Sequence, residues 1–216
     1  MNGFIYLHGF ASSPGSRKAE VFKERFARNS RELIVPDLNG DDFTRMTLSS
    51  QIRLVENVLN NRSEQQFGLI GSSMGGYLSA LLAEVHHKVA ALYLMAPGFN
   101  FLARWKEALS LDPGAGLVDG GLIRVFHYRY NEERDLSTDI FRDAEHWNAL
   151  PLLREVSTRI VHGINDDTVP VEESRQFVKD RPWRWLKELN ADHGLVDEVD
   201  WIVEDCLQFF RGEKLL

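Results

Sequence analysis

The stretch that decides the fold reads Phe67-Gly68-Leu69-Ile70-Gly71-Ser72-Ser73-Met74-Gly75-Gly76. Its first half is apolar, as in a buried strand, and a helix-forming sequence follows it. The G-x-S-x-G pattern between the two predicts a sharp strand-to-helix turn that holds the Ser73 hydroxyl outward at the end of a sheet. Glycines on both sides of the turn allow backbone to pass close to it. We predict that Ser73 is a nucleophile; the alternative is a solvated turn serine.

A serine hydroxyl is a weak nucleophile unless a base lies within hydrogen-bond reach and a third group orients that base. Of the seven histidines, His193 is the best placed for this role. It lies on a short polar turn directly after the strand-like run Trp183–Leu189. A loop at that position can reach across the strand ends. We therefore predict that His193 is the base, against the alternative of an ordinary polar turn histidine.

The acid is expected in the loop that follows Arg159-Ile160-Val161-His162-Gly163. There the chain continues Ile164-Asn165-Asp166-Asp167-Thr168-Val169-Pro170, and Asp166 fits a D-x-x-V-P arrangement in which Pro170 begins the next helix. We predict Asp166 as the acid. Asp167 is the competing residue, because adjacent aspartates in a turn also serve as turn or helix-capping residues.

Two backbone N–H groups are predicted to hold the oxyanion that forms during acyl transfer. The strand-like run Phe4–Leu7 ends in His8-Gly9-Phe10, so the N–H of Phe10 can face the position above Ser73. The N–H of Met74, at the start of the next helix, supplies the second donor. His8 is expected to brace its own loop through a hydrogen bond rather than to transfer a proton.

The order along the chain is Ser73, Asp166, His193, which is the nucleophile, acid, base order of α/β hydrolases. The chain resembles a compact α/β hydrolase and, within that superfamily, is similar to the small bacterial YqiA-type esterases. The residues that carry this resemblance are Tyr6-Leu7-His8-Gly9-Phe10, Ala11-Ser12-Ser13-Pro14, Pro36-Asp37-Leu38, Gly71–Gly76 and the loops of Asp166 and His193. The resemblance implies esterase activity on short acyl esters, with no cofactor.

Strand-prone runs alternate with helical patterns, which predicts an α/β fold with a mainly parallel sheet flanked by helices. About six strands are expected, over Gly3–His8, Glu32–Val35, Phe67–Gly71, Val89–Met95, Thr158–His162 and Trp183–Leu189. Helices are expected to begin at Ser16, Thr47, Ser73, Val171 and Val196. Residues 1–216 are predicted to form a single domain.

A cap insertion is predicted over residues 97–150, between the fourth and fifth expected strands. This stretch is rich in aromatic residues, among them Phe101, Trp105, Phe126 and Tyr128. These side chains either form a small core of their own or line an acyl or alcohol pocket over Ser73, and the sequence favours neither reading.

Composition narrows the choice of partners and location. The net charge of −7, without a stripe of lysine or arginine, argues against nucleic acid or an anionic membrane as a partner. The single cysteine, Cys206, allows no intrachain disulfide and is expected to be a buried apolar residue. No apolar run is long enough to span a membrane or resembles a signal peptide, so a cytoplasmic location is expected. No metal or cofactor site is predicted.

These features together predict a serine hydrolase that cleaves a small carboxylic ester or thioester through an acyl-enzyme intermediate. The same three side chains could instead support acyl transfer, C–C bond hydrolysis or peptide cleavage. A third alternative is a binding module that keeps the fold without catalysis. The physiological substrate and the oligomeric state are not predicted.

Overall fold

The structure, a computed structural model, describes residues 2–108 and 120–216. Its main sheet contains five parallel strands in the order β1-β2-β3-β6-β7. The strands are β1 (Asn2–Leu7), β2 (Gln66–Ser72), β3 (Val89–Met95), β6 (Ser157–Gly163) and β7 (Arg184–Leu189). Because all five run in the same direction, the loops that leave their carboxyl ends meet at one edge of the sheet.

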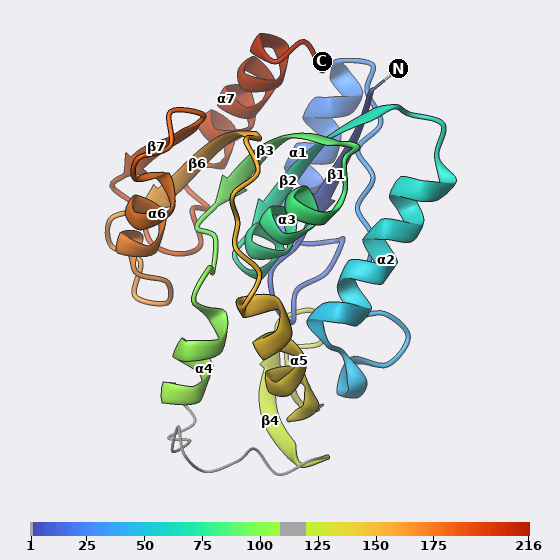
Figure 1. The fold of residues 1–216 in the computed structure, drawn as a ribbon, viewed down its shortest axis with the longest axis vertical. Coiled ribbons are helices and arrows are strands. Elements are labelled where there is room, and N and C mark those ends of the chain that lie inside the picture. Colours follow the sequence, from blue (N-terminus) through green and yellow to red (C-terminus); the bar gives the residue numbers. More distant parts are fainter. Residues whose placement is uncertain (1, 109–119) are drawn as a thin grey trace.

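Helices cover both faces of the sheet (Figure 1). The helices α1 (Arg17–Arg28) and α7 (Val199–Gly212) pack on one face. The helices α2 (Leu48–Asn61), α3 (Met74–Val85) and α6 (Val171–Val178) lie on the other. A short 3₁₀ helix, η1 (Phe43–Arg45), precedes α2. Helices α1 and α2 start where the sequence predicts: Ser16 caps α1, and Thr47 forms a capping box at α2.

The two faces of the sheet have separate cores, because alternate strand residues point to opposite sides. In β1, Phe4 and Tyr6 face the core beneath α1 and α7, and Ile5 and Leu7 face the core beneath α2 and α3. All four side chains are buried, as expected for a strand that is covered on both sides.

The predicted fold class, a mainly parallel sheet flanked by helices, is confirmed, although the sheet differs in one element. The expected strand Glu32–Val35 forms only an isolated bridge, in which Ile34 pairs with Ile5 of β1. The next residue that could donate to β1 is Pro36, which lacks an N–H group and so ends the pairing after one step. The sheet therefore has five strands and a single bridge at its β1 edge.

Between β3 and β6, the described residues form four elements that the sequence did not predict individually. They are α4 (Phe101–Ala108), the antiparallel pair β4 (Leu122–His127) and β5 (Glu132–Ser137), and α5 (Asp139–Asn148). Figure 1 shows them at the lower end of the sheet, away from both chain termini. Residues 109–119 of the predicted insertion 97–150 lie outside the described residues. Among the described helices, none combines the length and apolar character needed to cross a bilayer.

Candidate active site

Ser73 occupies a tight turn between β2 and α3. Its backbone has φ +54° and ψ −118°, a conformation that L-residues rarely adopt and that a surrounding structure must hold in place. A Cβ at Gly71 would lie 2.4 Å from the Gly75 carbonyl oxygen, and a Cβ at Gly75 would lie 2.1 Å from the Leu7 carbonyl oxygen. Both glycines are therefore required by space, which explains the pattern around Ser73.

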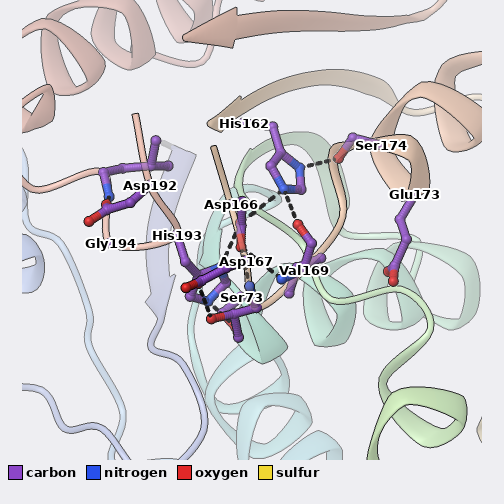
Figure 2. Close-up of polar contacts among 12 residues, drawn as sticks. Ser73, His162, Asp166, Asp167, Val169, Glu173, Ser174, Asp192, His193 and Gly194 are labelled. Carbon is purple, nitrogen blue, oxygen red and sulfur yellow. Dashed lines mark hydrogen bonds and ion pairs between the residues drawn. The ribbon is translucent and has the colours of Figure 1, made fainter. Parts of the chain in front are cut away.

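The structure brings Ser73, His193 and Asp166 together, although they are far apart in the sequence (Figure 2). The His193 Nε2 atom lies 3.0 Å from Ser73 Oγ, and His193 Nδ1 lies 2.7 Å from Asp166 Oδ2. A carboxylate can only accept, so the proton is on Nδ1 and Nε2 is free to accept from the Ser73 hydroxyl. The three side chains thus form a line through which a proton can leave Ser73.

Asp166 is held as a buried carboxylate, with its side chain fully excluded from solvent. Its Oδ1 atom accepts from the backbone N–H groups of Thr168 at 2.9 Å and Val169 at 2.7 Å. Burial alone would raise the Asp166 pKa, but hydrogen bonds from His162, His193 and the Val169 N–H outweigh it, and the pKa lies below its ordinary range. Asp167 is exposed and accepts only from the Thr168 hydroxyl at 3.2 Å, so it takes no part in this line.

His162, at the end of β6, also contacts Asp166. It is not among the site residues predicted from the sequence. Its Nε2 atom lies 3.1 Å from Asp166 Oδ2 and 2.9 Å from the Val169 carbonyl oxygen, and its Nδ1 atom lies 2.7 Å from Ser174 Oγ. His162 is completely buried. The spacing of four residues between His162 and Asp166 could have indicated this contact, because a tight loop after a strand can fold back and bring its residues against a side chain at the strand end.

The two predicted oxyanion donors belong to residues that lie close to Ser73. Phe10 and Met74 line the same pocket as Ser73 and His193. A Cβ at Gly9 would lie 3.5 Å from Ser73 Cβ, so the loop after β1 passes directly beside the serine. His8 braces this loop as expected: its Nδ1 atom bonds the Gly9 carbonyl at 2.9 Å, and its Nε2 atom accepts from the Leu38 N–H at 3.0 Å. The catalytic roles of these residues stay predictions.

Ser73 opens into a pocket of about 650 Å³. On one side lie the strand-end loops, and on the other lie residues of the insertion, including Phe101, Trp105, Phe126 and Tyr128. Some aromatic residues of the insertion therefore pack into a core and others line the pocket, which are the two alternatives that the sequence left open. Phe141 belongs to the buried core, Phe126 and Tyr128 line the pocket, and Phe101 and Trp105 do both. Across the described residues, no group of three or more His, Cys, Asp or Glu side chains could hold a metal ion.

A parallel sheet with helices on both faces and a serine in a strained strand-to-helix turn at its carboxyl edge define an α/β hydrolase. Residues 3–210 match the uncharacterised protein family UPF0227, and the chain belongs to this family.

Two curated relatives carry the name palmitoyl-protein thioesterase ABHD10, mitochondrial. The chain is 25% identical to the bovine protein over 212 residues, which cover 92% of this chain and 69% of the relative. It is 27% identical to the mouse protein over 189 residues, which cover 83% of this chain and 63% of the relative. The chain thus spans about two thirds of the length of these relatives.

Solved structures share the fold. The mouse α/β hydrolase domain-containing protein 10 superposes with a TM-score of 0.75 and 22% identity, covering 99% of this chain and 90% of that one. Est1E from Butyrivibrio proteoclasticus superposes with a TM-score of 0.74 and 19% identity, covering 96% of this chain and 88% of that one.

Proposed function

We propose that this protein hydrolyses a small carboxylic ester or thioester, with Ser73 as nucleophile, His193 as base and Asp166 as the acid that orients it. The observation that carries this proposal is the unbroken line of hydrogen bonds from Ser73 Oγ through His193 to Asp166. Thioester cleavage is included because two relatives are named thioesterases.

In the first half of the reaction, His193 Nε2 takes the Ser73 proton as Ser73 Oγ bonds to the substrate carbonyl carbon. The N–H groups of Phe10 and Met74 stabilise the negative charge on the carbonyl oxygen. When this intermediate collapses, the bond to the alcohol or thiol breaks, and that group leaves with the proton from His193. The acyl group remains on Ser73.

In the second half, His193 takes a proton from water, and the water oxygen bonds to the acyl carbon. The bond to Ser73 Oγ then breaks, the acid departs, and Ser73 recovers its proton from His193. Asp166 remains ionised throughout, because its hydrogen bonds favour the charged form. Its task is to keep the Nδ1 proton of His193 in place.

Turnover of p-nitrophenyl acetate and butyrate, and of a matched butyryl thioester, tests this proposal. Ser73→Ala should lower kcat by about 10⁴-fold or more, because no other group replaces the nucleophile. Ser157→Ala is the matched control: Ser157 begins β6 at the opposite end of the sheet and does not line the pocket. Full turnover by Ser73→Ala would refute the mechanism.

Labelling by a fluorophosphonate separates an active hydrolase from a binding module that keeps the fold. The folded protein should be labelled at Ser73, since the probe forms a bond only with an activated serine. A folded protein that is not labelled would favour the binding module.

A further inference from the structure

The charge of the pocket differs from the charge of the whole molecule. The chain has a net charge of −7, yet three cationic side chains line the pocket, namely Lys18, Arg104 and Arg124. Among the described lining residues there is no aspartate or glutamate. An apolar pocket whose described charged lining groups, His193 apart, are all cationic favours a ligand that carries negative charge.

Two of these three cations already have partners. Arg104 forms an ion pair with the buried Glu173, which also accepts from the backbone N–H of Asn100. Arg124 lies 3.5 Å from carboxylate oxygens of both Glu133 and Asp135 on the exposed β4–β5 pair. The positive charge of these arginines is therefore largely balanced within the protein.

Lys18 is different, because it forms no ion pair with any described residue. Its ammonium group donates one hydrogen bond, to the Gly194 carbonyl oxygen at 2.8 Å. An ammonium group has three N–H donors, so two remain for another partner. Burial lowers the pKa of Lys18 to about 8, while Asp192 and Asp166 act in the opposite direction. Asp192 and Asp166 lie near enough to act on this charge but do not contact it, so a partly desolvated ammonium group is left that an anion in direct contact would stabilise.

The position of Lys18 indicates which part of the substrate such an anion belongs to. Gly194 directly follows His193, so the ammonium group lies beside the residue that protonates the departing alcohol or thiol. Ser16, which caps α1, also lines the pocket and directs the positive end of that helix toward it. The Lys18 ammonium group and the N-terminus of α1 therefore both lie on the side of the pocket near His193, where the leaving group departs.

We propose that Lys18 binds an anionic group, a carboxylate or a phosphate, on the alcohol or thiol part of the substrate. This inference rests on the proposed function and adds a substrate class to it: acyl esters or thioesters whose leaving group is negatively charged.

Two esters of equal size test the proposal, 4-butanoyloxybenzoate and 4-butanoyloxybenzamide. They share the acyl chain and the ring, and the para carboxylate cannot reach its own ester. The wild-type protein should show a KM about 10-fold lower for the benzoate, as expected for a charge-assisted hydrogen bond. Lys18→Gln, which removes the charge but keeps a donor for Gly194, should abolish this difference by raising the KM for the benzoate relative to the KM for the benzamide.

Two further variants complete the design. Lys18→Arg should retain the preference for the benzoate, because it retains the charge. Lys23→Gln is the matched control: Lys23 lies on the same helix but bonds the Pro14 carbonyl and Glu20 instead of lining the pocket. Inhibition by the product 4-hydroxybenzoate gives a second measurement, and it should weaken in Lys18→Gln alone.

The outcomes separate this inference from the proposed function. If the wild-type protein cleaves neither ester nor p-nitrophenyl butyrate, the proposed function fails. If the wild-type protein cleaves both esters with the same KM, only the role of Lys18 is overturned. If Lys18→Gln lowers kcat for both esters alike, Lys18 merely anchors the loop of His193, and the proposal is again overturned.

A second pair of substrates tests on which side the charge lies. If Lys18→Gln raises the KM for mono-p-nitrophenyl glutarate relative to p-nitrophenyl pentanoate, and leaves the benzoate unaffected, the assignment to the leaving group is wrong. Replacing the benzoate by 4-butanoyloxyphenyl phosphate distinguishes the two anions. A loss of preference in Lys18→Gln for either anion supports the proposal, and the larger loss identifies the preferred group.

Discussion

His162 contacts Asp166, the last of the three side chains in the line from Ser73. The Val169 carbonyl can only accept, so the Nε2 atom of His162 carries a proton, which Asp166 shares. The Nδ1 atom then accepts from the Ser174 hydroxyl. The His162 ring thus donates to the same carboxylate oxygen that His193 contacts, and it helps to hold Asp166 in place.

Replacing His162 tests this support. In His162→Phe, Asp166 and the buried Val169 carbonyl both lose a donor, and the carboxylate is held less well. We expect kcat to fall by between about 10-fold and 100-fold with an unchanged KM, since small displacements of catalytic groups have effects of that size. The free energy of unfolding should fall by about 1–3 kcal/mol. Steady-state kinetics and urea unfolding measure the two quantities.

Ser174→Ala is the control for this prediction. It removes the donor to Nδ1 and leaves the proton that His162 shares with Asp166, so its effect on kcat should be much smaller. An unchanged kcat in a folded His162→Phe protein would show that Asp166 does not need the hydrogen bond from His162.

The charge of Lys18 gives a prediction for pH dependence. Burial lowers its pKa to about 8, and the nearby Asp192 and Asp166 act in the opposite direction, so the folded protein loses this positive charge as the pH rises through that value. The KM for 4-butanoyloxybenzoate should therefore rise above about pH 8, and the KM for the neutral benzamide should stay constant. Measuring both values from about pH 6.5 to about pH 9.5 checks this.

Lys18→Arg provides the control for pH, because a guanidinium group stays charged over this whole range. Its KM for the benzoate should not change with pH. If the KM for the wild-type protein stays equally flat, the ammonium group does not contact the anion.

At the level of single residues, the sequence could predict the position of Ser73 and His193 but could not fully separate the two aspartates. Asp166 and Asp167 are chemically identical neighbours, and only the spacing to Gly163 and Pro170 favoured the first. What distinguishes them is burial and the two backbone N–H groups that point at Asp166, which depend on how the loop closes. The contacts of His162 depend in the same way on the fold, because its partners Asp166 and Ser174 lie four and twelve positions later in the chain.

Among the elements, β1 and α3 approach each other closely beside the site. The first turn of α3 passes so near the end of β1 that a Cβ at Gly75 would meet the carbonyl carbon of Leu7 at 2.5 Å and the carbonyl oxygen of His8 at 2.6 Å. The backbone of Gly75 has an ordinary negative φ, so space rather than conformation excludes a side chain.

Gly75→Ala should therefore push α3 away from β1. We expect the free energy of unfolding to fall by about 1–3 kcal/mol, as for other overpacked sites. Activity should fall as well, because Ser73 and Phe10 are carried by the two elements that separate. Urea unfolding and turnover of p-nitrophenyl butyrate measure both effects.

Gly212→Ala is the matched control in the last turn of α7, where no atom lies within 4 Å of the added Cβ. Its free energy of unfolding should be unchanged or higher by up to about 1 kcal/mol, because alanine favours helix more than glycine does. If Gly75→Ala proved equally harmless, the two elements would be free to move apart without cost.

The elements of the sheet could be predicted because their apolar runs alternate with helices. The exception, Glu32–Val35, reads as a strand by its residues, and the limit on its pairing is set by Pro36, which follows it. The elements between β3 and β6 could not be predicted in the same way. The exposed residues of β4 include Leu122 and Phe126, so its pattern does not separate a buried face from a polar one.

At the scale of the whole molecule, the pocket lies between the carboxyl edge of the sheet and the insertion. Its size therefore depends on side chains that come from both parts. Trp105 of α4 meets Phe10 of the β1 loop edge to face, with ring centroids 4.7 Å apart, and it also packs against Phe101 and Phe141. The indole of Trp105 thus fills space between the insertion and the loop of the predicted oxyanion donor.

Removing this indole should enlarge the pocket. In a p-nitrophenyl ester series from acetate to dodecanoate, Trp105→Ala should move the optimum of kcat/KM toward longer acyl chains, because an apolar cavity accommodates added methylene groups. The free energy of unfolding should fall by up to about 3 kcal/mol, since the residue is only partly buried. The matched control is Trp201→Ala, whose indole is 42% exposed on α7 and does not line the pocket. An unshifted optimum in Trp105→Ala would place the acyl chain elsewhere, leaving the space near Trp105 to the alcohol or thiol.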